Sequence, residues 1–414
     1  MTTTTHPTNA IPAETTLLRF ATAGSVDDGK STLVGRLLHD SKSVLTDQLE
    51  AVEHASRNRG QDTPDLALLT DGLRAEREQG ITIDVAYRYF ATPRRRFILA
   101  DTPGHVQYTR NMVTGASTAE LAVVLVDARN GVVEQTRRHA AVAALLRVPH
   151  VVLAVNKMDL VDWSEKEFLR ITEDFARCTA ELRHATGGFT AIPVSALAGD
   201  NVVDRSAHMD WYTGPTLLGH LETVRTDDGE ADRPARLPVQ YVIRHGDVRH
   251  YAGQLATGEL RTGDAVVVLP SGVTSTVTAV DRLGEPVDAA YALDSVSVRL
   301  ADDLDIGRGD LIAPVAEAPA LARSIDADVC HLHDRALRVG DRVLLRHTTR
   351  TVKAIVQDLP GRPDGSLTAN ELGRIRLRTA EPLAADAYAA SRRTGSFLLI
   401  DPADGSTLTA GMVR

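Results

Sequence analysis

Residues Gly24 to Ser31 have the sequence Gly-Ser-Val-Asp-Asp-Gly-Lys-Ser, which fits G-x-x-x-x-G-K-[ST], the phosphate-binding P-loop. A mostly apolar run of strand length, 17–23, precedes the motif, and apolar residues at helical spacing follow it over 32–39. The motif therefore lies between a strand and a helix, which is the setting that its chemistry requires. This placement disfavours the alternative, a glycine-rich turn that ends by chance in Lys-Ser.

The residue types of this loop match the contacts that a polyphosphate needs. Gly24 and Gly29 let the backbone pass close to the phosphates because neither has a Cβ atom. The loop N–H groups and the start of the next helix point at the anion. Lys30 reaches the outer phosphates, and the Ser31 hydroxyl can bind Mg²⁺. The predicted contacts are Gly24, Ser25, Val26, Asp27, Asp28, Gly29, Lys30, Ser31 and Thr32.

The composition is that of an ordinary globular protein, and 414 residues suggest roughly two to four domains. A formal net charge of −9 disfavours a protein that coats nucleic acid. No apolar run is long enough to span a bilayer. Cys178 and Cys330 lie far apart, which fits a reducing cytosol. The threonine-rich N-terminus lacks the apolar segment that a secretory signal peptide contains. We therefore expect a disordered tail over 1–15 and a cytoplasmic protein.

A second loop precedes the next strand-like run. Residues Arg77 to Asp84 have the sequence Arg-Glu-Gln-Gly-Ile-Thr-Ile-Asp, and 85–90 is rich in β-branched and aromatic residues. In isolation this stretch is the turn before a strand. Beside a P-loop, a threonine hydroxyl on such a loop can join the Mg²⁺ shell only while a γ-phosphate is present. Thr82 is the candidate for this role.

The next motif ends a strand of the buried type, 97–100, with the residues Asp101-Thr102-Pro103-Gly104-His105. An aspartate at the carboxyl end of a strand can hold Mg²⁺ through water, so Asp101 joins Ser31 and Thr82 as a predicted metal ligand. Gly104 can offer its N–H to the γ-phosphate. His105 then lies where a side chain would orient the attacking water. A surface histidine is the alternative, but the position directly after Asp-x-x-Gly favours a functional one.

A guanine-reading motif, Asn156-Lys157-Met158-Asp159, follows the apolar strand 151–155. The Asp159 carboxylate can accept two hydrogen bonds from the N1–H and 2-amino groups of guanine, which adenine cannot supply. Asn156 would bond the purine and hold the P-loop, while the Lys157 stem packs along the base. After a short strand, Ser195-Ala196-Leu197 can bring a backbone N–H to the guanine oxygen. The predicted ligands are GTP and GDP.

Three consecutive arginines, Arg94-Arg95-Arg96, follow Pro93 between two strand-like runs. A basic patch for phosphate and a solvated hairpin turn both fit this stretch. The turn residues favour the solvated hairpin.

The motifs occur in the order expected of an open α/β sheet, each at a strand end. They resemble the translation-factor superfamily of GTPases, and within it the GTPase subunit of sulfate adenylyltransferase. Asp28 stands where elongation factors typically have histidine. Thr102 and the segment Gln107 to Arg110 resemble the GTPase subunit of sulfate adenylyltransferase. Other similar stretches are Val126 to Val132, Gln135 to His139, Asp210 to Leu218, Pro238 to Val242, Tyr251 to Gly253, Val268 to Val273 and Arg308 to Leu311.

The resemblance covers nearly the whole chain and departs at Val106, where glutamate is expected. It implies that Lys30 and His105 carry out GTP hydrolysis, and that Val26 and Ile81 form an apolar gate around His105. Simple loop packing explains these two apolar residues equally well. Bifunctional relatives carry an adenylylsulfate kinase with its own P-loop, and the sequence to Arg414 has no second such motif.

The resemblance implies a GTP-hydrolysing subunit that drives ATP and sulfate to adenylyl sulfate and pyrophosphate on a separate small adenylyltransferase subunit. The two chains would form a heterodimer or a higher assembly, with no nucleic-acid or membrane partner. The alternative function is an elongation-factor-Tu-like GTPase that delivers aminoacyl-tRNA on the same architecture. Asp28, Thr102 and the segment Gln107 to Arg110 argue against this alternative.

The rest of the chain has short alternating runs separated by glycine turns, which predict antiparallel strands. The expected fold is an α/β P-loop GTPase domain, with a mostly parallel sheet and helices on both faces, followed by two small antiparallel β-barrel domains. The expected divisions are the tail 1–15, the GTP-binding domain 16–225, the linker 226–236, the first barrel 237–317 and the second barrel 318–414.

Overall fold

The computed structural model of the chain describes residues 16–42, 46–58, 64–69, 85–102, 109–180, 188–226, 229–246 and 248–414. The predicted tail 1–15 lies outside these ranges, as do the site residues Ile81, Thr82, Pro103, Gly104 and His105. The chain forms two compact units, 1–226 and 227–414.

The first unit is built on a six-stranded sheet of order β2-β3-β1-β4-β5-β6, whose pairings are parallel apart from the antiparallel β2. All seven residues of β4 are buried, as expected where both faces of a parallel sheet are covered. The predicted mostly parallel α/β fold is confirmed. The strands are β1 (Leu17–Ala23), β2 (Ala86–Ala91), β3 (Arg96–Asp101), β4 (Leu121–Asp127), β5 (His150–Asn156) and β6 (Thr190–Pro193).

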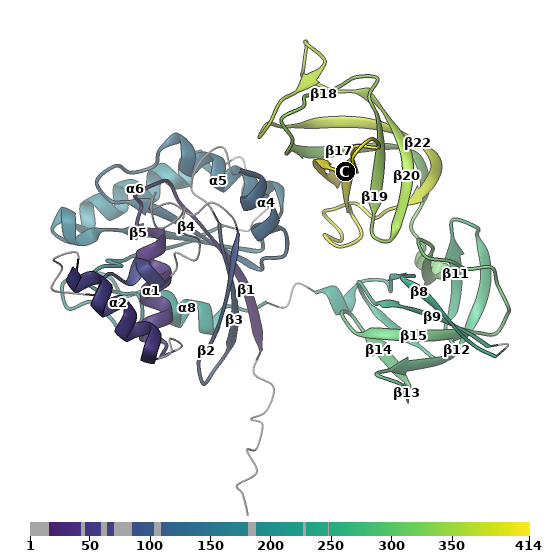
Figure 1. Cartoon of the computed structure of the whole chain (residues 1–414), viewed down its shortest axis with the longest axis horizontal. Helices are drawn as coiled ribbons and strands as arrows, with labels where there is room; N and C mark the ends of the chain where they lie inside the picture. The colour runs from purple at the N-terminus through teal and green to yellow at the C-terminus, as the bar shows by residue number, and fades with distance from the viewer. Residues whose placement is uncertain are drawn as a thin grey trace, which may run out of the picture. The chain divides into compact units, whose positions relative to one another are not determined.

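Helices cover both faces of this sheet, with α1 and α8 on one face and α5 and α6 on the other (Figure 1). Helix α6 begins where the Ser164 hydroxyl accepts the Glu167 N–H at 3.4 Å, and it buries Phe168, Ile171 and Phe175 at helical spacing. The helices are α1 (Lys30–Asp40), α2 (Thr46–Asn58), α4 (Thr109–Ser117), α5 (Glu134–Leu145), α6 (Glu165–Cys178) and α8 (Leu217–Thr223), with the short 3-10 turns η1 (Leu66–Leu69) and η3 (Met158–Val161).

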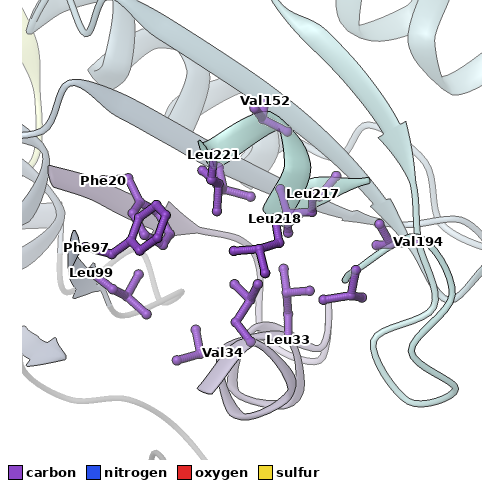
Figure 2. Packing of buried hydrophobic residues seen from close by; sticks show 14 of the residues in the cluster. Phe20, Leu33, Val34, Phe97, Leu99, Val152, Val194, Leu217, Leu218 and Leu221 are labelled. Atoms are coloured by element: carbon purple, nitrogen blue, oxygen red, sulfur yellow. The ribbon is translucent and has the colours of Figure 1, made fainter. Parts of the chain in front are cut away.

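An apolar core fixes the two elements that flank the P-loop. The Phe90 and Phe97 rings stack with centroids 4.6 Å apart, and Phe20 of β1 meets each of them edge-on at 6.2 Å. Figure 2 shows Phe20 and Phe97 in one cluster with Leu33 of α1 and Leu217 of α8. Burial of these side chains holds β1 and α1 in place, so the loop between them has fixed ends.

The second unit begins with a sheet of order β7-β16-β11-β12-β15-β9-β8, with β13 paired to β12. β7 and β8 stand at opposite ends of this order, yet only residues 239 and 240 separate them, so the sheet curls round on itself. The strands are β7 (Leu237–Pro238), β8 (Tyr241–His245), β9 (Val248–Gln254), β11 (Ala265–Leu269), β12 (Val273–Arg282), β13 (Glu285–Val287), β15 (Ser295–Leu300) and β16 (Leu311–Pro314), beside the pair β10 (Glu259–Arg261) and β14 (Ala289–Tyr291).

A closed antiparallel barrel of order β17-β22-β20-β19-β23-β24 follows, as the sequence predicts. Buried Val352, Ala354 and Val356 alternate with exposed residues along β20, which is the pattern of a strand with one face in a core. The barrel strands are β17 (Leu321–His331), β19 (Arg342–His347), β20 (Arg350–Asp358), β22 (Leu372–Ala384), β23 (Ser396–Ile400) and β24 (Thr407–Val413), with the pair β18 (Leu337–Arg338) and β21 (Ser366–Leu367) beside them. The 3-10 turns of this unit are η5 (Glu230–Asp232) and η6 (Val315–Glu317).

The prediction of a solvated turn is wrong for Arg95. Its side chain is buried, and its guanidinium donates to Leu221 O at 3.0 Å, to Val224 O at 2.6 Å and to the Thr226 hydroxyl at 2.9 Å. The cause is a long-range contact, since the hairpin packs on the chain segment that leaves α8. Its neighbour Arg94 is exposed, as predicted.

Candidate nucleotide-binding site

The loop between β1 and α1 has the backbone that the P-loop motif requires at Gly29. Its φ is +88°, a left-handed conformation that side chains disfavour. A Cβ atom added there would lie 2.4 Å from Asn156 Nδ2, so the position also has no room for a side chain. At Gly24 the corresponding Cβ would lie 3.1 Å from the Leu125 Cβ, a milder approach. The two glycines thus let the loop lie against the ends of β4 and β5.

Lys30 and Asp101 form a buried ion pair at the start of α1 and the end of β3. The Lys30 Nζ lies 2.6 Å from Asp101 Oδ1, and the side chains are 7% and 2% exposed. The Thr22 hydroxyl donates to the same oxygen at 3.0 Å, and the Thr102 hydroxyl donates to Thr22 O at 2.6 Å. The structure therefore brings the predicted phosphate-binding lysine and the predicted metal-binding aspartate together at the carboxyl edge of the sheet.

The Asn156 side chain joins three loops of the site. Its Nδ2 donates to Asp28 O at 2.8 Å, and its Oδ1 accepts the Ala196 N–H at 2.9 Å. Arg36 of α1 adds a further connection, because its Nε donates to Ala196 O at 3.1 Å and its guanidinium also donates to Leu197 O. The predicted link between Asn156 and the P-loop is present, and it extends to the 195–197 segment.

A second network, which the motifs do not predict, holds Lys157. Its Nζ lies 3.0 Å from Asp127 Oδ2 and donates to Asp27 O. Arg129 bonds the same carboxylate through Nε at 3.1 Å and through a terminal nitrogen at 2.6 Å. Burial alone would raise the pKa of Asp127, but the hydrogen bonds from Arg129 and Lys157 lower it to about 2. Asp127 is therefore ionised at neutral pH and fixes the lysine side chain beside the P-loop.

The position of Asp127 in the sequence could have identified it. It is the last residue of β4, as Asp101 is of β3 and Asn156 is of β5. Parallel strands bring such end residues to one edge of the sheet, where open α/β folds bind their ligands.

Asp28 closes the P-loop on itself. Its Oδ2 accepts the Ser25 N–H at 2.6 Å, and the side chain is buried. Burial raises the pKa of Asp28 to about 6; the Ser25 N–H opposes this rise and the Asp127 charge adds to it. Asp28 thus shapes the loop from within.

Asp159 offers a buried acceptor at the far end of the same site. It lies in η3, and its Oδ1 atom is buried without a hydrogen-bond partner among the described residues. Leaving a buried carboxylate oxygen unpaired costs free energy, so this atom fits a ligand with N–H donors. In the 195–197 segment, the Ser195 and Ala196 N–H groups are bonded to Asp200 O and Asn156 Oδ1. The Leu197 N–H is therefore the donor of that segment best suited to a base oxygen.

The remaining predicted contacts divide into two groups. Val26 is 43% exposed on the P-loop, Ser31 and Thr32 lie in the first turn of α1, and Met158 is fully buried as the first residue of η3. Ile81, Thr82, Pro103, Gly104 and His105 lie outside the described residues. The apolar gate, the threonine metal ligand and the water-orienting histidine therefore stay predictions.

The chain is similar in sequence to known proteins over most of its length. Residues 15–256 match the family described as elongation factor Tu GTP binding domain, and 324–414 match the family described as GTP-eEF1A C-terminal domain-like. Sulfate adenylyltransferase subunit 1 of Aliarcobacter butzleri is 47% identical over 96% of this chain and 87% of its own length. The chain belongs to the sulfate adenylyltransferase subunit 1 family. The predicted resemblance is confirmed at the level of the family.

Two further relatives are similar to this chain over the same share of its length. Sulfate adenylyltransferase subunit 1 of Salmonella typhimurium is 48% identical over 96% of this chain and 85% of its own length. The bifunctional enzyme CysN/CysC of Mycobacterium tuberculosis is 56% identical over 96% of this chain and 67% of its own length. Within the residues that the structure describes, no helix has the length and apolar character needed to cross a membrane.

Proposed function

We propose that this chain is the GTP-hydrolysing subunit of sulfate adenylyltransferase. GTP hydrolysis on it would drive the joining of ATP and sulfate into adenylyl sulfate and pyrophosphate on a separate small subunit. The observation that carries the proposal is the identity of 47% and 48% to relatives named as subunit 1 of this enzyme. The Gly29 backbone and the unpaired Asp159 oxygen support a guanine nucleotide as the ligand.

Residues of three loops would together bind GTP and GDP. The backbone of Gly24 to Thr32 surrounds the phosphates, and Lys30 neutralises their charge. Asn156 to Asp159 and Ser195 to Leu197 read the guanine, and the Asp127 network keeps Lys157 beside the base. Binding energy from the base then positions the phosphates for reaction.

The residues proposed to hold Mg²⁺ are Ser31, Thr82 and Asp101. Hydroxyl and carboxylate oxygens are the ligands that this hard cation prefers, and buried Asp101 already balances one cation, Lys30. When bound, Mg²⁺ neutralises charge on the outer phosphates. Ser31 follows Lys30 directly in α1, so phosphate and metal contacts would come from adjacent residues.

The proposed division of the chain keeps a GTP-binding domain over 16–225, a linker over 226–236 and barrel domains over 237–317 and 318–414. The limit between the two compact units, after Thr226, supports the start of this linker.

Reconstitution with the small subunit tests the proposal. This chain alone is expected to hydrolyse GTP slowly and to release no pyrophosphate from ATP in the presence of sulfate. The small adenylyltransferase subunit should supply that activity, and GTP should raise it, because the two reactions would share one coupled complex. Pyrophosphate release is measured with ATP, sulfate and GTP, with and without the partner, and with a non-hydrolysable GTP analogue as control. Tight GTP-dependent binding of aminoacyl-tRNA, with no sulfate adenylyltransferase activity, would replace this proposal with the alternative, a GTPase that delivers aminoacyl-tRNA.

His105→Ala is expected to slow single-turnover GTP hydrolysis by at least about 10²-fold while GTP affinity stays near that of the parent. The reason is that a group orienting the attacking water acts mainly in the transition state. Hydrolysis is followed by quenched-flow with the partner present. His54→Ala, at an exposed position on α2, is the matched control. A rate within twofold of the parent would assign the role to another residue.

A further inference from the structure

One face of the first unit has a cavity that the nucleotide site does not use. The strand register places Tyr89, Ile98 and Arg19 in one row across β2, β3 and β1. Tyr87 and Ala100 form the next row, one step nearer the nucleotide edge. The cavity has a volume of about 190 Å³ and is lined by residues of both rows and of α4.

Helix α4 packs on Ala100 of the second row and leaves the tyrosines of β2 exposed. A Cβ atom on Gly115 of α4 would lie 3.3 Å from the Ala100 Cβ and 2.6 Å from Thr102 Cγ2, so helix and strand are in close contact there. Tyr89 is 71% exposed and Tyr87 is 44% exposed. Two tyrosines thus stand side by side on one face of β2, which is an edge strand of the described sheet. Tyrosine is enriched where proteins bind one another.

Arg19 adds a positive charge to the same row. Its side chain is half-buried, and in the described ranges no ion pair joins its guanidinium to a carboxylate. The nearby Glu120 accepts the main-chain N–H of Arg19 at 2.8 Å instead. A guanidinium that lines the same cavity as two tyrosines is suited to receive a carboxylate from outside, through charge-assisted hydrogen bonds.

The size of the cavity argues for a protein side chain as its occupant. Pockets for small molecules usually have about 300–1,000 Å³, and this cavity is smaller. It suits a single apolar side chain inserted as an anchor, the arrangement found at the centre of protein interfaces. An acidic residue next to that anchor would meet Arg19.

We propose that the tyrosine surface, defined as Arg19, Tyr87, Tyr89 and Ile98, docks the small adenylyltransferase subunit through a segment with an apolar anchor flanked by a carboxylate. This inference rests on the proposed function. The surface also adjoins the GTP site: Asp101 lies three residues after Ile98 on β3, and α4 begins four residues after His105 in the sequence. A partner bound here would contact β3 and α4, the elements before and after His105 in the sequence, which gives coupling between the subunits a short physical route.

Affinity measurements on four variants test the docking surface. Tyr89→Ala and Arg19→Glu are each expected to raise the Kd for the small subunit about 30-fold, the loss typical of an interface hot spot. Tyr89→Phe and Arg19→Lys should stay within threefold of the parent, because they keep the ring and the charge. Tyr291→Ala is the matched control, since this tyrosine is 50% exposed on β14 of the second unit. GTP binding by each variant alone checks that the first unit is folded.

Photo-crosslinking identifies the occupant directly. With p-benzoyl-phenylalanine in place of Tyr89, the full chain is expected to crosslink to the small subunit, and the same substitution at Tyr291 is not. Unchanged Kd values for Tyr89→Ala and Arg19→Glu would overturn the inference, as would crosslinks confined to the chain itself or to a second copy. If the parent chain forms no complex with the small subunit and gains no sulfurylase activity, the proposed function fails instead.

Discussion

Asp159→Asn is expected to reverse the base selectivity of the site, weakening GTP and strengthening binding of a xanthine nucleotide. The buried Oδ1 of Asp159 has no partner among the described residues, so guanine N–H groups would supply one. An amide at this position would present a donor to those N–H groups, whereas the 2-oxo group of xanthine can accept from it. A site built to pair such groups discriminates by roughly 10⁴-fold.

Equilibrium titration of both nucleotides against parent and variant measures this change. Asp162→Asn is the matched control, since it makes the same substitution three residues later at an exposed position. The control should leave the ratio of the two affinities unchanged. GTP affinity in Asp159→Asn equal to that of the parent would remove Asp159 from the base site.

Sequence alone located the parts of the site that follow strands. Asp101 and Asn156 could be placed because parallel strands carry their end residues to one edge, and that rule needs no knowledge of side-chain contacts. Gly29 could be predicted from its motif, and the structure adds a steric reason, the approach of the Asn156 amide. These features depend on local pattern and topology, which a sequence records directly.

Other features depend on contacts between distant residues and could not be predicted. Arg95 looks like a turn residue, but its partners are carbonyls near 221–226, which no local pattern connects to it. The row of Tyr89 and Arg19 exists only through the register of three strands. The position of Asp127 at a strand end is visible in the sequence, but its contact with Lys157 is not, because a carboxylate that holds a lysine belongs to no common motif.

Lys30→Met is expected to lower the unfolding free energy of the first unit by about 3–5 kcal/mol, in addition to weakening GTP. The Lys30 and Asp101 side chains are 7% and 2% exposed, so removal of the cation leaves a buried carboxylate with only the Thr22 hydroxyl as a described donor to Oδ1. Guanidinium denaturation without nucleotide or metal measures the change. Both tryptophans, Trp163 and Trp211, lie in the first unit, so their fluorescence reports its unfolding.

The double variant Lys30→Met/Asp101→Asn separates the cost of a buried unpaired charge from a general loss of packing. Replacing both members of a buried ion pair is often nearly neutral, so the double variant should recover most of the stability lost in Lys30→Met. The amide that Asp101→Asn introduces has a carbonyl oxygen, which can still accept a hydrogen bond from the Thr22 hydroxyl and so keep one of the original bonds.

Lys166→Met, at an exposed position on α6, is the control and should lower the unfolding free energy by less than about 1 kcal/mol. If Lys30→Met lowers the unfolding free energy no more than this control does, the Lys30–Asp101 pair is hydrated in solution. The pair then contributes to nucleotide binding without stabilising the fold. If the double variant is no more stable than Lys30→Met, the loss comes from the packing of the lysine stem and not from the unpaired charge.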